Sequence, residues 1–287
     1  MQSGLQASED STRRGLGNVA RQTLAIRAGA GLGDAIYLQS VARHFVEQGF
    51  AVEACSGYPE VFSQLPHCTV SGFRRERIDR LAHYSLRRGD RETTQFQDCC
   101  IQAGITEPVD LRLDWTVQND WTGLKVLKSK LDAPLIFVPM PRAPFARKDG
   151  FGAEFLPDCR TIQRAIDLLK DRALIVQVGC GPNLFPFQNL DVDLAQKTSV
   201  EDVLDLGMIA DGFIGFCSFV VPLAESFKKP ALFVWSRRAK RSAHTVVRQM
   251  TPQKILHRES SRFVFDDCNQ EELETAVDAL LRAARGS

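Results

Sequence analysis

Two apolar runs without polar alternation lie close together in the last third of the chain, at Gly212–Phe216 and Ala231–Trp235. Continuous apolar runs of this length are typical of parallel β-strands covered on both faces. Between them, Cys217-Ser218 form a tight polar turn, and Pro222 fits the first turn of a short helix over about 221–227. The pattern therefore predicts a βαβ unit.

Strand-like and helix-like patterns also alternate through the rest of the chain. Strands are expected at 23–27, 50–55, 111–115, 135–138 and 173–178, and helices at about 36–48, 60–65, 94–103, 160–170, 198–207 and 269–284. Such alternation predicts an α/β protein with parallel sheets. A boundary near residues 131–134 would divide the chain into two halves, because a fresh apolar strand starts there.

The turn after the strand Gly212–Phe216 is a candidate ligand site, because ligands of parallel sheets collect at the carboxyl ends of the strands. With Pro222 in the first helical turn, the amides of residues 218–221 would be free to face an anion. The alternative is an ordinary packing unit that binds nothing.

A second candidate site is the glycine-bearing loop after the strand at 23–27, with glycines at positions 29, 31 and 33. A strand, a glycine loop, a helix and a second strand are the opening of a Rossmann-like half. The glycines alone are also explained by a helix that begins close to the sheet. Asp34 at the start of this helix is either a partner of the helix dipole or an exposed catalytic base.

Composition narrows the class of protein. The 287 residues are 44% hydrophobic and 25% charged, as in ordinary soluble proteins, and a net charge of +1 gives no overall case for binding nucleic acid or an anionic membrane. Local basic clusters at 74–77 and 237–241 are expected to be solvated, or to contact an acceptor or a phosphate.

Eight cysteines without a C-x-x-C pair indicate reduced thiols in a cytoplasmic protein, and no zinc site is expected. No apolar run approaches the roughly 18 residues that span a bilayer, so no integral membrane segment is expected. Residues 1–20 are polar and lack an apolar core, which predicts a disordered tail and not a signal peptide.

Two segments together resemble the glycosyltransferases of the bacterial heptosyltransferase type. Gly33-Asp34 matches the Gly-Asp that precedes the first helix in that family. The family's donor motif is a strand, then Gly-x-Asp-Thr-Gly-x-x-His, then Leu-Ala-x-Ala, then Pro and a strand. Residues 215–225 match it in register, and Pro230 and its strand follow in order.

This resemblance implies the GT-B fold, with two Rossmann-like domains that face each other across a cleft. The tail at 1–20 would precede an acceptor-side domain at 21–133, a nucleotide-sugar-binding domain at 134–265 and a C-terminal helix at 266–287. The implied reaction moves a sugar from a nucleotide-diphosphate sugar to an acceptor hydroxyl, with inversion, no metal and no further cofactor. The acceptor stays open: a saccharide, a protein side chain or a modified nucleic-acid base.

The resemblance makes Asp34 the base that takes the acceptor proton. The donor would be held by eight residues: Gly33, Arg142, Lys148, Gly179, Ser218, Phe219, Val220 and Glu225. Among these, Arg142 or Lys148 would supply a cation for the leaving diphosphate. Glu225 is either a ribose contact or a surface glutamate. The Asp-x-Asp at 191–193 resembles a metal motif of other sugar transferases, but lies in a connecting segment and is set aside.

The chain departs from the family at the donor motif. Cys217-Ser218-Phe219 replaces Asp-Thr-Gly, and Pro222 replaces the histidine. Two alternatives therefore remain: an S-adenosylmethionine-dependent methyltransferase, whose glycine loop residues 28–34 also resemble, and a degenerate GT-B protein that binds a nucleotide or partner without turnover.

Overall fold

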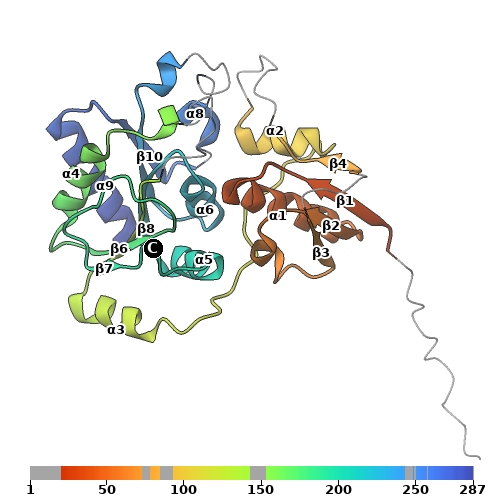
Figure 1. Ribbon diagram of the computed structural model, residues 1–287, viewed down its shortest axis with the longest axis horizontal. Helices are drawn as coiled ribbons and strands as arrows, with labels where there is room; N and C mark the ends of the chain where they lie inside the picture. The colour runs from red at the N-terminus through yellow and green to blue at the C-terminus, as the bar shows by residue number, and fades with distance from the viewer. Residues whose placement is uncertain are drawn as a thin grey trace, which may run out of the picture.

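The computed structural model describes residues 21–72, 78–84, 93–142, 153–242, 248, 250–256 and 258–286. The expected tail at 1–20, the basic cluster at 74–77 and Lys148 lie outside these residues. Within them, the chain forms two lobes side by side, one red to yellow and one green to blue (Figure 1). Each lobe is built on its own parallel sheet, as the alternation of strand and helix patterns predicts.

The N-terminal sheet has the order β3-β2-β1-β4, and all its strand pairs are parallel. Its strands are β1 (Thr23–Arg27), β2 (Ala51–Cys55), β3 (Cys68–Ser71) and β4 (Arg80–Leu81), and its helices are α1 (Leu32–Glu47), the 3-10 helix η1 (Pro59–Phe62) and α2 (Gln95–Gln102). The buried side of α1 carries the predicted apolar positions Ile36, Leu38, Val41, Ala42 and Phe45, while Val46 is half-buried. Gly49 follows the end of the helix with a φ of 93°.

The C-terminal sheet has the order β10-β9-β8-β5-β6-β7, again with parallel pairs throughout. Its strands are β5 (Leu135–Pro139), β6 (Leu174–Val178), β7 (Val192–Asp193), β8 (Gly212–Phe216), β9 (Ala231–Trp235) and β10 (Ser261–Phe265). The accompanying helices are α3 (Thr122–Leu131), η2 (Ala153–Phe155), α4 (Cys159–Leu169), α5 (Val200–Ile209), α6 (Val220–Ser226), η3 (Ala239–Arg241), α8 (Pro252–Ile255) and α9 (Gln270–Arg285).

Every residue of β5, β6, β8 and β9 is buried, which confirms that these continuous apolar runs are strands covered on both faces. Helices α4 and α9 pack on one face with the side chains of one apolar cluster. Helices α5 and α6 cover the other face, which also receives the N-terminal lobe. The predicted boundary near residue 133 falls between the two sheets, and the limits of the domains themselves remain a prediction.

The prediction of a strand at 111–115 is wrong, although the side chains of this segment alternate between buried and more exposed positions. Leu111, Leu113 and Trp115 are buried, at 4%, 4% and 5% exposed. The backbone of this segment is bound by side chains of α1 and not by a neighbouring strand. Gln39 exchanges hydrogen bonds with the Asp114 amide and carbonyl, and Ser40 does so with those of Arg112.

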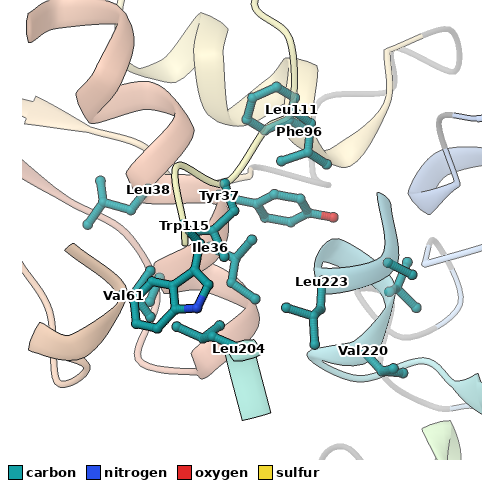
Figure 2. Close-up of a cluster of buried hydrophobic side chains, with 14 of the residues drawn as sticks. Ile36, Tyr37, Leu38, Val61, Phe96, Leu111, Trp115, Leu204, Val220 and Leu223 are labelled. Atoms are coloured by element: carbon teal, nitrogen blue, oxygen red, sulfur yellow. The ribbon is translucent and has the colours of Figure 1, made fainter. Parts of the chain in front are cut away.

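A single apolar core runs from one lobe into the other. Figure 2 shows Ile36 and Tyr37 of α1 beside Leu204 of α5 and Leu223 of α6, and Trp115 lies at one side of this cluster. All of these side chains are buried. The two lobes therefore meet through packed apolar side chains along the contact of α1 with α6 and of η1 with α5.

The segment that connects the lobes is bound by one buried carboxylate. Asp205 of α5 accepts hydrogen bonds from Trp115 Nε1 at 2.8 Å, Trp121 Nε1 at 3.2 Å, and the amides of Gln118 and Asn119 at 2.9 and 2.8 Å. The Asp205 side chain is fully buried. Because all four donors belong to the connecting segment, this residue fixes where the chain crosses from the N-terminal lobe to α3.

Candidate functional site

The Asp34 carboxylate is folded back over the glycine loop that precedes it. Its Oδ2 accepts the amide of Gly31 at 3.0 Å, inside the first turn of α1. A Cβ on Gly29 would lie only 2.3 Å from the same oxygen. Glycine at position 29 is therefore required for space, because any side chain would displace the carboxylate.

Burial raises the pKa of the Asp34 carboxyl above its usual value, while the hydrogen bond from Gly31 and the charge of His83 lower it. The same carboxylate acts on its surroundings. It contributes to the raised pKa values of Tyr84 and Cys99, for which burial is the larger cause. Asp34 is thus an acid held in a partly desolvated environment of phenols and a thiol.

Strand order explains why these groups gather around Asp34. β1 lies between β2 and β4, so the loops that leave their carboxyl ends emerge side by side. Directly after β4, the Ala82 amide donates to the Arg27 carbonyl at 2.8 Å. His83 and Tyr84 follow. These two residues were missed from the sequence because β4 has only two residues and no apolar run.

The glycine loop and the start of α6 are in direct contact. A Cβ on Gly33 would lie 3.2 Å from Pro222 Cγ and 3.3 Å from the Phe219 Cα. Gly33 and Phe219, which the sequence assigns to one site from segments far apart, are therefore brought together. Pro222, the departure from the family's histidine, forms part of this contact surface.

At the start of α6, Ser218 and Phe219 are partly exposed, whereas Val220 is fully buried. The Ser218 hydroxyl donates to the Phe216 carbonyl at 3.2 Å. The prediction that all amides of 218–221 are free is wrong at Val221, whose amide donates to the Ser218 carbonyl at 3.2 Å. This hydrogen bond joins residues i and i−3, as in a tight turn, and not residues i and i−4 as in a regular α-helix.

Arg142 and Gly179 follow β5 and β6 at the carboxyl edge of the C-terminal sheet. Arg142 lies along Gly181, where a Cβ would be 3.1 Å from its Nε, and its Nη1 donates to the Cys180 carbonyl at 3.5 Å. Gly179 has a φ of 133°, and its amide donates to Thr198 Oγ1 at 3.3 Å. These contacts brace the loop that presents the exposed Arg142 side chain.

Tyr58, in the loop after β2, connects the two lobes electrostatically. Burial raises the pKa of its phenol, the charge of Arg142 lowers it, and the charge of Asp34 raises it. The charges of Asp34 and Arg142 thus both act on Tyr58, a residue that the sequence did not single out because its loop has no recognisable motif.

Glu225 is fully buried, so its interpretation as a surface glutamate is wrong. Its carboxylate accepts a hydrogen bond from the Ser261 hydroxyl, and its carbonyl accepts one from Arg258 Nε at 2.7 Å. Arg258 also reaches Asp110 at 3.0 Å, on the segment that connects the lobes. Its role as a ribose contact remains a prediction.

Other charged motifs have local partners. Arg237 pairs with Asp267 at 2.9 Å and lies over the Phe265 ring, as does Lys240, so this part of the basic cluster is used within the molecule. In the Asp-x-Asp at 191–193, Asp191 and Asp193 each accept a backbone amide.

The eight cysteines are unpaired in the structure. In the part of the chain that the structure describes, no three His, Cys, Asp or Glu side chains are grouped so that they could hold a metal ion. Across the same residues, none of the helices combines the length and apolar character needed to cross a bilayer.

No protein-family model matches this chain, and no curated protein matches it significantly. Several solved structures are similar to it. The E. coli ADP-heptose LPS heptosyltransferase II is 12% identical, with 91% of this chain and 99% of that chain covered and a TM-score of 0.61. The iron-containing dodecameric glycosyltransferase TibC from enterotoxigenic E. coli H10407 is 15% identical, covering 93% and 79%, with a TM-score of 0.58.

The E. coli heptosyltransferase WaaC with ADP is 11% identical, covering 91% of this chain and 97% of that chain, with a TM-score of 0.52. Identities this low establish a shared fold and leave the chemistry to be argued from the site. The chain has the two-domain GT-B fold, which confirms the fold that the motif resemblance implies. None of these three structures is a methyltransferase.

Proposed function

We propose that this chain is a heptosyltransferase-like glycosyltransferase that moves a sugar from a nucleotide-diphosphate sugar to an acceptor hydroxyl. The observation that carries the proposal is the contact of Gly33 with Phe219 and Pro222. It brings the Asp34 turn against the start of α6, so that a base and a donor segment from different lobes share one site.

In the proposed reaction, Asp34 accepts the proton of the acceptor hydroxyl while that oxygen attacks the anomeric carbon. The bond from this carbon to the diphosphate breaks, and the diphosphate leaves with its electron pair, which inverts the centre. A carboxylate whose pKa burial raises is a stronger base than an exposed one. The Gly31 amide holds it in place.

The leaving diphosphate would meet Arg142 and the partly exposed turn at Ser218 and Phe219. Arg142 can offer a planar pair of N–H donors to phosphate oxygens. Lys148 is proposed as a second cation. Because WaaC was solved with ADP and TibC with ADP-D-β-D-heptose, an adenine nucleotide is the first donor class to test.

Calorimetry with ADP, UDP and GDP tests donor binding, and a coupled assay of nucleotide release tests turnover. Asp34→Asn should leave nucleotide affinity nearly unchanged and remove turnover, since it keeps the size of the side chain and loses the base. Asp278→Asn, in an exposed ion pair on α9, is the matched control. Retained turnover in Asp34→Asn would refute the base assignment.

Arg142→Gln and the double variant Ser218→Ala with Lys148→Ala should each weaken nucleotide binding. Loss of one charged hydrogen-bond pair corresponds to roughly 10-fold or more in affinity. Arg172→Gln, which removes an exposed arginine on the far side of the C-terminal lobe, should bind as the parent chain does. Unchanged affinity in both site variants would place the donor elsewhere.

A non-catalytic nucleotide-binding protein is the second candidate, because the donor motif is altered in a way that matters physically. Cys217 replaces the family's aspartate, and burial raises the pKa of its thiol to about 12. It therefore carries no charge at neutral pH and offers only a weak donor. Nucleotide binding without release of product, with any acceptor, would support this candidate.

The cytoplasm is the proposed compartment, on the evidence of eight unpaired cysteines, which an oxidising compartment would tend to pair.

A further inference from the structure

His83 and Asp34 stand on neighbouring loops of the fold, although they are distant in sequence. The strand register places the end of β4 against the end of β1, with Arg27 opposite Leu81. The Ala82 amide closes this pairing on the Arg27 carbonyl at 2.8 Å, and His83 is the next residue. The loop that carries Asp34 leaves the same end of β1. The two side chains thus belong to neighbouring loops at one sheet edge.

The imidazole of His83 is held in a defined orientation. Its ring stacks on Tyr84, with the ring centroids 5.0 Å apart and the planes at 23°. Its Nδ1 lies 2.8 Å from the Tyr84 carbonyl oxygen. A carbonyl can only accept, so Nδ1 carries a hydrogen in this contact. In the neutral ring Nε2 then has the free lone pair, and it can take up a proton.

Asp34 needs such a neighbour because it is partly buried. Its Oδ2 is occupied by the Gly31 amide, and among the described residues no donor reaches its Oδ1. His83, in contrast, is exposed to solvent. His83 therefore offers a group between the neighbourhood of Asp34 and solvent through which a proton can leave.

We propose that His83 is a positioning residue for Asp34 that passes the proton of this carboxyl to solvent after each turnover. This assignment rests on the proposed glycosyl transfer. The acceptor proton moves to Asp34 as the new glycosidic bond forms and the diphosphate leaves. It then passes, by way of a water molecule between the two side chains, to Nε2 of His83 and from there to bulk water, which restores the carboxylate and the neutral ring without any further reactant.

The other groups around Asp34 do not suit this role. Tyr58 after β2, Tyr84 after β4 and Cys99 on α2 are phenols and a thiol whose pKa values burial raises, so they stay protonated. Glu225 on α6 acts on Tyr37 instead. Arg142, on the C-terminal lobe, is a permanent cation. An imidazole is the kind of side chain that ordinarily exchanges protons near neutral pH. Of the groups named around Asp34, His83 is the imidazole.

The first test needs no substrate. Carbon-13 NMR of the apo protein follows the titration of the Asp34 carboxyl in the parent chain and in His83→Gln. The pKa of Asp34 should move upward in His83→Gln, because the opposing charge is lost. His44→Gln, at the other end of α1 and paired with Glu107, is the matched control and should leave it unchanged. An unchanged Asp34 titration in His83→Gln would overturn the assignment whether or not transfer is ever found.

The second test uses turnover. His83→Gln and His83→Ala should lower kcat about 10- to 100-fold, the lower range for a lost proton-transfer group, with KM for the donor unchanged. Added imidazole should restore part of the kcat of His83→Ala, and the acidic limb of the pH profile should shift to higher pH. Full kcat in both variants would refute the relay while leaving Asp34 as the base. If turnover is lost in Asp34→Asn but kept in both His83 variants, the proposed function stands and the role of His83 is refuted.

Discussion

Replacing Asp205 with alanine should cost more stability than any other single removal of a carboxylate described above. The carboxylate accepts from four N–H donors of the connecting segment, at 2.8 to 3.2 Å, and its side chain is fully buried. Alanine leaves these donors without their acceptor. The bond from Trp115 Nε1 is itself buried, so water cannot replace it without opening the core.

The magnitude follows from the kind of donor. A buried donor left unsatisfied costs about 1–3 kcal/mol, and a bond to a charged acceptor is at the upper end. The bond from the Trp115 indole is fully buried and is counted at this cost. The bonds from the Trp121 indole and from the amides of Gln118 and Asn119 are only partly buried, so water takes over part of the bonding. The expected loss is therefore about 3–5 kcal/mol, a large fraction of a typical domain stability of roughly 5–15 kcal/mol.

Urea denaturation followed by tryptophan fluorescence and by circular dichroism measures this loss. Both Trp115 and Trp121 contact Asp205, so fluorescence reports the same region. Asp205→Asn, which keeps one acceptor oxygen, should lose less than Asp205→Ala. Asp278→Ala breaks an exposed ion pair and should cost no more than about 1 kcal/mol. A loss below about 1 kcal/mol in Asp205→Ala would show that the connecting segment is not held by this carboxylate.

Three further substitutions test the candidate site and the contact between the two lobes. Gly29→Ala should lower turnover with little loss of nucleotide affinity, because its Cβ would stand 2.3 Å from Asp34 Oδ2 and push the carboxylate aside; unchanged kcat would contradict this. Tyr37→Phe should leave the free energy of unfolding unchanged or raise it by roughly 1 kcal/mol in thermal and urea unfolding, because among the described residues the buried Tyr37 hydroxyl has no hydrogen-bond partner; a clear loss would reveal a bound water or another partner. Asp34→Asn should be more stable than the parent chain at neutral pH, with a difference that shrinks as the pH falls. Burial raises the folded-state pKa of Asp34, so the protonated carboxyl favours the folded state. This contribution to stability is lost as the pH rises from the unfolded-state pKa through the folded-state pKa. An equal difference between the two proteins at every pH would refute this.

The tertiary structure decided three matters that one-dimensional patterns cannot express. The 111–115 segment alternates like a strand, yet Gln39 and Ser40 of α1 bind its backbone in place of a neighbouring strand. Glu225 could have been a surface residue of α6, yet it is completely buried, and its carboxylate accepts a hydrogen bond from Ser261 of β10. The amide of Val221 is used locally, because the turn after Ser218 is tight.

The sequence by itself determined the α/β class, the parallel strands and the pair of motifs that share the site. Continuous apolar runs, glycines at a strand end and acidic first turns are local features, and their physical causes act within a few residues. Which side chains meet depends on strand order and on how the lobes pack. His83 and Tyr58 joined Asp34 because β1 lies between β2 and β4, and Gly33 met Phe219 because α1 packs on α6. Those contacts join residues that are far apart in the chain, so only the folded structure could decide them.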